Sequence, residues 1–323
     1  MARPPGRAFF VFAPAVATLP GTTRSTTPPF MLRIALPNKG RLADDARALF
    51  ADAGLEAHTS GDRALTASLG GEFEAIFVRA ADIPEFVADG AADVGVTGWD
   101  LVSESGRELR EMLDLGFGAC RIVVAATEES RIATLDDIPG DGRPTRVATV
   151  FPRITERFFA ARGQRVTVVP VSGACESAPH LGIADVVVDI TSTGSTLRTN
   201  GLREVATVLR STARLVATPA MADGPGGGAA TTALGELTTA LESVLRARGQ
   251  RYVMANVPRA ALDAVKQVLP GLRGPTVVDV LDGGTHVAVH AVAPARSIYR
   301  TIAQLRQLGG EGILVTRIER LMP

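Results

Sequence analysis

Cysteine, tryptophan and tyrosine are scarce in this chain of 323 residues, which holds two cysteines, one tryptophan and two tyrosines. Cys120 and Cys175 stand far apart and in no metal-binding or redox spacing, which argues against a disulfide framework and a cysteine-based metal site. No nucleophile motif accompanies either residue, so we expect structural thiols. This cysteine usage indicates a reducing compartment, and we expect the cytoplasm.

An excess of charge of one sign and long apolar runs are also absent. Lysine plus arginine and aspartate plus glutamate each number 34, so the net charge is zero. This balance argues against a protein that coats nucleic acid. No segment approaches the about 20 uninterrupted apolar residues of a membrane helix. We therefore expect neither nucleic acid nor a membrane as a partner.

Residues 1–30 contain arginines and prolines but no acidic residue. A short apolar run over residues 8–16 resembles a secretory signal, but Pro14 interrupts it and no clean cleavage site follows. Met31 leads at once into a predicted strand. We expect the extension to be disordered or a start-site artefact.

The common nucleotide-binding and metal-binding motifs are missing as well. Neither a Walker A sequence nor a Gly-x-Gly-x-x-Gly after a strand is present, so any ATP is bound without a P-loop. His286 and His290 share one face of a predicted strand. Ordinary sheet residues explain them better than metal ligands.

A different phosphate site is predicted between Asp185 and Asn200. Three valines indicate a buried strand that ends on the carboxylate of Asp189. A glycine among five hydroxyl residues follows: Thr191, Ser192, Thr193, Gly194, Ser195 and Thr196. These residues suit an anion, because the hydroxyls and backbone amides can donate hydrogen bonds and the glycine lets the backbone approach a ligand closely. A helix starting near Leu197 would add its N-terminal dipole to the site. A carboxylate beside such a loop suits a sugar phosphate, whereas the plain alternative is a turn with an ordinary Ser/Thr helix cap.

Several charged residues could complete this site. Lys39 and Arg41 follow one predicted strand, Arg79 follows another, and Arg63 precedes a Leu-Thr pair. These cations could clamp phosphates, although each could equally be a solvated surface charge. Glu176 could join Asp189 around Mg²⁺, which usually takes one or two carboxylates plus substrate phosphates. A helix-surface position is the alternative for Glu176. Trp99 is either a wall for a purine or a core anchor.

The sequence repeats its plan over the first two thirds of the chain. Residues 146–152 echo 33–37, and residues 182–186 echo 90–94. Each half reads strand, helix, further strand, and then a strand that ends in a Thr-Gly turn before a helix. This pattern predicts two α/β lobes, with both turns facing one cleft at the carboxyl ends of the strands. The strands predicted after the loop, over 202–209 and 214–217, are expected to return to the first lobe.

The last part of the chain has another plan. Strands are predicted over 252–257, 276–281, 285–292 and 313–318, with helices from Pro258 and Ala295 and a hairpin turn at 282–284. The order βαββαβ is ferredoxin-like. We expect residues 31–120 plus 205–235 to form lobe I, residues 121–204 to form lobe II with the loop, and residues 250–323 to form a separate domain.

The run from Ala184 to Leu202 closely resembles the phosphoribosyl-diphosphate signature of the ATP phosphoribosyltransferases. The resemblance covers essentially residues 31–322. It includes, in order, Pro37-Asn38-Lys39-Gly40-Arg41-Leu42, Gly95-Val96-Thr97-Gly98, Leu115-Gly116-Phe117-Gly118, Gly274-Pro275-Thr276 and the tail Gly312-Ile313-Leu314-Val315.

The resemblance implies an enzyme of histidine biosynthesis that joins ATP to 5-phosphoribosyl 1-diphosphate with Mg²⁺, releasing pyrophosphate. It implies a periplasmic-binding-protein-like bilobed core, an ACT-like domain that binds histidine as feedback inhibitor, and dimers that assemble into hexamers. By the same resemblance, Asp189 holds the ribose hydroxyls and residues 192–196 hold the 5-phosphate. Lys39, Arg41, Arg63 and Arg79 serve ATP or pyrophosphate, and Asn256 and Thr276 contact the effector.

Two other functions fit part of this pattern. A non-catalytic solute-binding or regulatory protein could use the same bilobed fold, but a receptor has no need of a ribose carboxylate beside a phosphate loop. A phosphoribosyltransferase for another base would usually show two adjacent acids before the loop. Here Ile190 follows Asp189.

Overall fold

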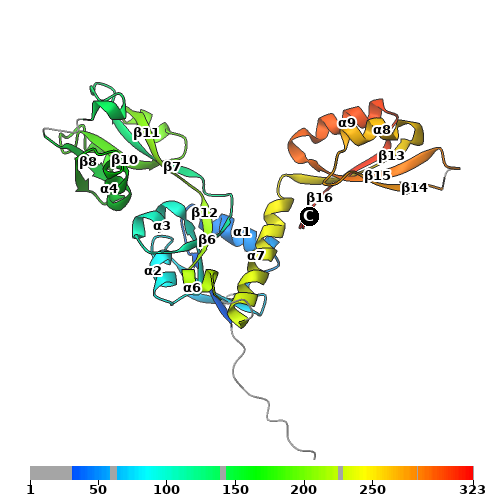
Figure 1. Ribbon diagram of the computed structural model, residues 1–323, viewed down its shortest axis with the longest axis horizontal. Helices are drawn as coiled ribbons and strands as arrows, with labels where there is room; N and C mark the ends of the chain where they lie inside the picture. The colour runs from blue at the N-terminus through cyan, green and yellow to red at the C-terminus, as the bar shows by residue number, and fades with distance from the viewer. Residues whose placement is uncertain (1–30, 59–63, 139–142, 225–227, 282, 323) are drawn as a thin grey trace, which may run out of the picture. The chain divides into compact units, whose positions relative to one another are not determined.

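The computed structural model describes residues 31–58, 64–138, 143–224, 228–281 and 283–322. The expectations for residues 1–30, for Arg63 and for Asp282 therefore lie outside the described residues. Three sheets organise the described chain (Figure 1). No described helix is both long enough and apolar enough to span a membrane.

The first sheet has seven strands in the order β2-β3-β4-β1-β5-β12-β6. Along the chain these are β1 (Leu32–Pro37), β2 (Ala57–His58), β3 (Thr66–Leu69), β4 (Phe73–Val78), β5 (Val94–Gly98), β6 (Arg110–Asp114) and β12 (Ala213–Ala217). Strand β1 runs parallel to β4 and β5, and β12 runs antiparallel to β5 and β6.

Helices cover both faces of this first sheet, because its central strands are apolar on both sides. One face packs on α1 (Ala43–Asp52) and α7 (Ala229–Ala247) through the largest core cluster. The other face packs on α2 (Ile83–Ala88) and α3 (Trp99–Ser105), where Trp99 is a half-buried core residue (Figure 1). The short helix α6 (Pro219–Ala222) precedes α7.

The second sheet has five strands in the order β11-β7-β10-β8-β9. They are β7 (Cys120–Thr127), β8 (Thr145–Thr149), β9 (Val166–Pro170), β10 (Val186–Thr191) and β11 (Leu202–Ser211). Helix α4 (Pro152–Ala160) packs on one face. The other face packs on α5 (Ser195–Thr199) and on the single turn Cys175–Ser177.

One prediction about this sheet is wrong. Strand β11 does not return to the first lobe but pairs antiparallel with β7, from Leu202 opposite Thr127 to Ser211 opposite Cys120. The boundary expected after residue 204 therefore falls inside β11. An apolar strand pattern does not say which sheet a strand joins. Here the chain leaves α5 beside the end of β7, where the Glu128 amide donates to the Gly201 carbonyl at 3.0 Å.

The repeat seen in the sequence is confirmed by matching contacts in the two sheets. In the first sheet the Arg33 amide donates to the Asp93 carboxylate at 2.7 Å, and the Asp93 amide donates back to the Arg33 carbonyl at 2.9 Å. In the second sheet Arg146 and Asp185 make the same two bonds at 2.8 and 2.9 Å. Asp93 in the first sheet and Asp185 in the second thus hydrogen-bond the start of one parallel strand to the neighbouring strand in the same way.

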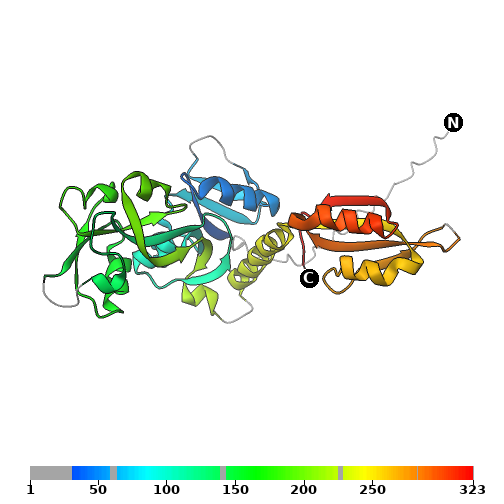
Figure 2. The same ribbon diagram turned by 90° about the horizontal axis from the view of Figure 1, so that it is seen from above.

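The third sheet confirms the ferredoxin-like prediction. Its strands are β13 (Gln250–Pro258), β14 (Thr276–Asp279), β15 (His286–Pro294) and β16 (Glu311–Arg317), in the antiparallel order β14-β15-β13-β16. Helices α8 (Leu262–Val268) and α9 (Ile298–Gln307) both pack on one face (Figures 1 and 2). The second face of this sheet carries Tyr252, Met254 and His290, which are only half-buried.

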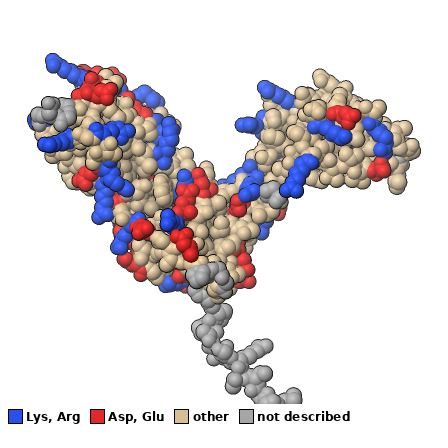
Figure 3. Space-filling view, in the orientation of Figure 1, with Lys and Arg blue, Asp and Glu red and all other residues tan. Residues whose placement is uncertain are grey.

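The strands whose ranges the sequence did not predict are β2, β3, β6 and β9, which lie at sheet edges or next to one. They are partly exposed and carry no long apolar run. On the face drawn in Figure 3, basic and acidic side chains are both spread over the surface, in keeping with the net charge of zero.

Candidate active site

The hydroxyl-rich loop is a turn that presents its side chains outward. Strand β10 ends at buried Thr191, whose Oγ1 accepts the Gly194 amide proton at 2.8 Å. Gly194 has φ of 76°, in the left-handed region that a residue with a Cβ rarely adopts. The loop is thereby closed from within, and the side chains of Ser192, Thr193, Ser195 and Thr196 are exposed.

The plain alternative, an ordinary Ser/Thr helix cap, does not describe this turn. The residue at the helix cap is Gly194, and no side chain caps α5. Thr193 and Ser195 instead hydrogen-bond to each other at 3.0 Å between their hydroxyl oxygens. Since α5 is a single short turn, the helix dipole adds little, and the hydroxyl groups are the main donors that the loop offers.

A cavity of about 260 Å³ joins this loop to Arg41. It is lined by Arg41, Ile190, Thr191, Ser192, Thr193, Ser195 and Thr196. Arg41 comes from the turn after β1 in the first sheet, so the cavity is lined by residues that lie about 150 positions apart in the sequence. Of the three predicted cations that the structure describes, Arg41 is the one that lines this cavity.

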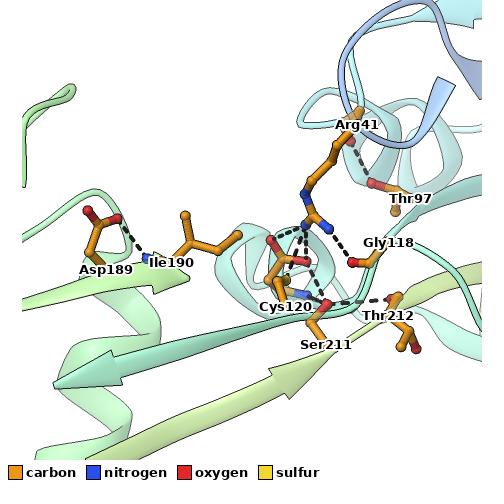
Figure 4. A network of polar contacts seen from close by, with 10 residues as sticks. Arg41, Thr97, Gly118, Cys120, Asp189, Ile190, Ser211 and Thr212 are labelled. Carbon is orange, nitrogen blue, oxygen red and sulfur yellow. Dashed lines mark hydrogen bonds and ion pairs between the residues drawn. The ribbon is translucent and has the colours of Figure 1, made fainter. Parts of the chain in front are cut away.

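Arg41 is held by a network at the start of β7 (Figure 4). Its guanidinium group lies 3.4 Å from Asp100 Oδ2 and 3.3 Å from Cys120 Sγ, and it also donates to the Gly118 carbonyl. The Asp100 side chain is 2% exposed and the Arg41 side chain 38%. Arg41 is therefore a fixed, ion-paired cation with one side open to solvent.

Ser211 completes this network from the last residue of β11. Its hydroxyl donates to Asp100 Oδ1 at 2.6 Å and accepts the Asp100 amide proton at 3.0 Å. Burial raises the pKa of the Cys120 thiol, and the nearby Asp100 carboxylate raises it further against the opposing effect of Arg41. Cys120 therefore stays a neutral thiol, as a structural role requires.

Asp189 lies one strand residue before Ile190 and is half-buried. Burial raises the pKa of its carboxyl group, the Ile190 amide at 2.7 Å lowers it, and the charge of Glu176 raises it again. Asp189 does not line the cavity beside Arg41, but it shares a face of β10 with Thr191, two residues on. No cation pairs with Asp189 or Glu176 among the described residues.

The turn that carries Glu176 also holds the second cysteine. Burial raises the pKa of the Cys175 thiol to about 12, with the charges of Asp189 and Glu176 acting in the same direction. Cys175 packs against Val187 of β10, two residues before Asp189, so the turn and Asp189 lie on the same face of the second sheet. Among the described residues, no group of three or more His, Cys, Asp or Glu side chains could hold a metal ion.

Lys39 and Arg79 lie on neighbouring turns at the carboxyl ends of β1 and β4. The Asn38 amide donates to the Val78 carbonyl at 2.8 Å, which brings the two turns together. Both side chains are exposed, and neither lines the cavity beside the loop. Arg63 lies outside the described residues, so its role as a phosphate contact stays a prediction from the sequence.

The two predicted effector residues do not line the same cavity. Thr276 lines a cavity of about 560 Å³ in the third sheet together with Tyr252, Arg273 and His290. The Tyr252 hydroxyl and His290 Nδ1 are 2.8 Å apart, which accounts for His290 as a hydrogen-bonded sheet residue. Asn256 is exposed on β13, opposite Ala288, and does not line this cavity.

Sequence reasoning missed Asp100 and Ser211. Asp100 stands in the first turn of a predicted helix, where an acidic residue is ordinary. Ser211 is one of many serines near a strand end. No local signal marks either residue, because their role arises only where β7, β11 and α3 meet.

The chain resembles known proteins over most of its length. Residues 79–243 match the family described as ATP phosphoribosyltransferase, and residues 247–320 match the family described as HisG, C-terminal domain. A protein named ATP phosphoribosyltransferase from Gemmatimonas aurantiaca is 70% identical over 295 residues, covering 91% of this chain and 100% of that protein. A protein of the same name from Natronomonas pharaonis is 49% identical over 293 residues, covering 90% and 100%.

Among solved structures, the chain is similar to one described as an ATP phosphoribosyl transferase (HisG:HisZ) complex from Thermotoga maritima. The TM-score is 0.57 at 25% identity, and the match covers 67% of this chain and 99% of that one.

Proposed function

Because this chain belongs to the ATP phosphoribosyltransferase family, we propose roles for individual residues in the reaction that defines that family. The enzyme transfers the phosphoribosyl group of 5-phosphoribosyl 1-diphosphate to ATP, in histidine biosynthesis. The alternative of a non-catalytic solute-binding protein is not favoured by relatives that share the whole chain from the first lobe to the C-terminal domain.

The chemistry sets what the site must supply. A bond forms between adenine N1 and the anomeric carbon of the ribose, while the bond from that carbon to the pyrophosphate oxygen breaks. Positive charge develops on the ribose and negative charge on the leaving group. Since N1 carries a free lone pair, no strong base is needed, and holding two anionic substrates in line is most of the task.

We assign the 5-phosphate to the loop of residues 192–196. Its support is the cavity of about 260 Å³ in which four hydroxyl side chains and the Arg41 guanidinium group converge. Hydrogen bonds from a cation and several hydroxyls suit a phosphate dianion. Arg41 also keeps Asp100 as its partner, so it adds a directed donor rather than a full uncompensated charge.

We assign the ribose hydroxyls to Asp189. A carboxylate has two oxygens that accept hydrogen bonds from a vicinal diol, and Asp189 stands just before the loop on the same strand. Burial and the charge of Glu176 disfavour its ionised form. Hydroxyl donors from a bound ribose would favour that form, so substrate binding and ionisation of Asp189 support each other.

We propose that Asp189 and Glu176 also hold Mg²⁺ when the diphosphate substrate is bound. The charge of Glu176 acts on Asp189, and neither carboxylate has a cationic partner among the described residues. This donor set fits Mg²⁺, which takes one or two carboxylates and completes its shell with water and phosphate oxygens. When bound, the ion would stabilise charge on the leaving pyrophosphate.

Replacing Glu176 with glutamine tests the metal assignment. Losing one of two carboxylate ligands is expected to raise the Mg²⁺ concentration for half-maximal activity by about tenfold. A Mg²⁺ titration of pyrophosphate release measures this effect. Glu156→Gln is the matched control, because Glu156 is an exposed residue of α4. Equal Mg²⁺ dependence of the two variants would remove Glu176 from the metal site.

Lys39, Arg79 and Arg63 remain proposed contacts for ATP or pyrophosphate. Lys39 and Arg79 are exposed on adjoining turns at one sheet edge. Ligands of open α/β sheets bind at this carboxyl edge. Since Lys39 and Arg79 do not line the loop cavity, we propose that they contact the part of the substrates farthest from the 5-phosphate.

We propose that histidine inhibits the enzyme by binding the C-terminal domain, with Thr276 in its site and Asn256 as the second candidate. The cavity that Thr276 shares with Tyr252 and His290 is the support. Thr276→Val is expected to raise the histidine concentration for half inhibition by about tenfold, because one hydrogen bond to a charged ligand is lost. Inhibition is measured relative to each variant's own uninhibited rate, with Asn256→Ala tested in parallel. An unchanged inhibition curve for Thr276→Val would exclude that residue from the effector site.

A further inference from the structure

Two arginines stand directly opposite each other on neighbouring strands of the second sheet. Arg121 on β7 is the register partner of Arg210 on β11. Directly opposed residues of an antiparallel pair project to the same face, and like charges in such a pair are destabilising. An arrangement of this kind calls for something that compensates the charge.

Among the residues that the structure describes, one of these two arginines has an acidic partner. Arg121 forms an ion pair with Glu204, and its side chain is 25% exposed. Glu204 is held in turn by the Thr207 hydroxyl at 3.3 Å. Arg210 is exposed and makes no ion pair among the described residues. Within the described part of the chain, the positive charge of Arg210 therefore has no acidic partner.

The same row of residues leads to the phosphate loop. Arg121 is the register partner of Arg210 on one side and of Thr191 on β10 on the other. Thr191 is the residue whose hydroxyl closes the loop onto Gly194. The side chains of Thr191, Arg121 and Arg210 thus project from one face across three adjacent strands.

A second cavity lies over this row. It measures about 390 Å³ and is lined by Asp114, Ala119, Cys120, Arg121, Ser192, Arg210, Ser211, Thr212 and Arg214. Its charged lining consists of three arginines and one aspartate. Arg214 is already neutralised by Glu111 at 3.1 Å and by Asp114. Burial disfavours the charge of Asp114, but the Gly116 amide, the Thr212 hydroxyl and Arg214 outweigh it and hold its pKa below the usual range.

Ser192 lines both this cavity and the smaller one beside Arg41. A ligand group bound by the loop is therefore next to a group bound over Arg121 and Arg210. Both substrates of the reaction carry a chain of linked phosphates. Their negative charge suits two neighbouring arginines of which one, Arg210, makes no ion pair among the described residues.

We propose that Arg121 and Arg210 form a polyphosphate subsite, with Arg210 as its main binding residue. The inference rests on the proposed phosphate role of residues 192–196. The bound group is either the diphosphate of 5-phosphoribosyl 1-diphosphate or the triphosphate of ATP, and both share the chemistry of linked phosphates. Bound polyphosphate would relieve the repulsion between the two arginines as it binds.

Arg210→Gln tests this subsite by binding of inorganic pyrophosphate and tripolyphosphate to the full chain, measured by calorimetry. We expect affinity for at least one probe to fall about tenfold, because a charge-assisted hydrogen bond is lost. Weaker pyrophosphate binding with a higher KM for 5-phosphoribosyl 1-diphosphate assigns the subsite to that substrate. Weaker tripolyphosphate binding with a higher KM for ATP assigns it to ATP. Arg121→Gln is expected to act in the same direction.

Arg165→Gln is the matched control, since Arg165 is an exposed residue before β9 and lines neither cavity. Equal affinities of Arg165→Gln and Arg210→Gln for both probes would overturn the proposal. The probes contain no ribose, so the comparison of Arg210→Gln with Arg165→Gln does not depend on whether Asp189 holds the ribose hydroxyls. A failure of the Asp189 assignment is thereby distinguishable from a failure of the arginine subsite.

Discussion

Replacing Asp189 with alanine is expected to lower kcat/KM for 5-phosphoribosyl 1-diphosphate by about a thousandfold, from two lost charge-assisted hydrogen bonds of roughly 2 kcal/mol each. The folded chain should not lose stability, because burial and Glu176 already disfavour the ionised carboxylate. Steady-state kinetics of pyrophosphate release together with urea unfolding measure the two effects. Histidine binding, proposed for another sheet, should stay intact.

Asp185 provides the matched control for this variant, four residues earlier in the chain. Its carboxylate accepts the Arg146 amide proton at 2.8 Å and pairs with Arg143 at 2.8 Å. Asp185→Ala is therefore expected to reduce the free energy of unfolding, which Asp189→Ala should not. Asp189→Asn keeps the size of the side chain and should lose most of the activity as well. A kcat/KM of Asp189→Ala equal to that of the wild type would contradict the assignment of the ribose hydroxyls to Asp189.

Replacing Asp100 with alanine is expected to destabilise the chain by about 2–3 kcal/mol, somewhat below the cost of breaking a fully buried ion pair because Arg41 is partly exposed. The variant leaves the Arg41 guanidinium group without its carboxylate and the Ser211 hydroxyl without its acceptor. Turnover should also fall, since Arg41 loses the contact that directs it toward the phosphate loop. Urea unfolding and steady-state kinetics measure these two losses.

A double-mutant cycle separates the ion pair from the other contacts of Asp100. Arg41→Gln and Asp100→Asn each remove one charge, and the double variant removes both. If the two residues stabilise each other, the double variant loses less free energy of unfolding than the sum of the single losses. Strict additivity would show that Arg41 and Asp100 do not interact in solution. Ser211→Ala then tests the neutral part of the network alone.

The sequence alone determined the features that depend on near neighbours in the chain. Alternating and continuous apolar runs marked the central strands, since these are buried on one or both faces. The glycine among hydroxyls after Asp189 marked the phosphate loop, because its conformation is closed by the bond from Gly194 to Thr191, three residues away. The order of elements after residue 250 predicted the third sheet, because the order βαββαβ is typical of the ferredoxin-like fold.

Edge strands and sheet membership were less predictable from local pattern. Strands β6 and β9 lie at edges, are partly exposed and lack an apolar run. The residues of β11 show a strand pattern. The pairing of β11 with β7, however, depends on the position in space at which α5 ends. A strand pattern records burial and not the identity of the neighbour.

Only the tertiary structure decided which charged residues act together. Lys39 and Arg41 are two positions apart, yet Arg41 alone reaches Asp100 and the loop cavity. Arg121 and Arg210 are 89 positions apart and meet only through the register of β7 with β11. The sequence pattern around a charged residue does not reveal its ion-pair partner, because the energy of an ion pair depends on distance in space and not on separation in the chain. The phosphate loop is thus readable from the sequence, whereas the cations around it are set by the packing of strands.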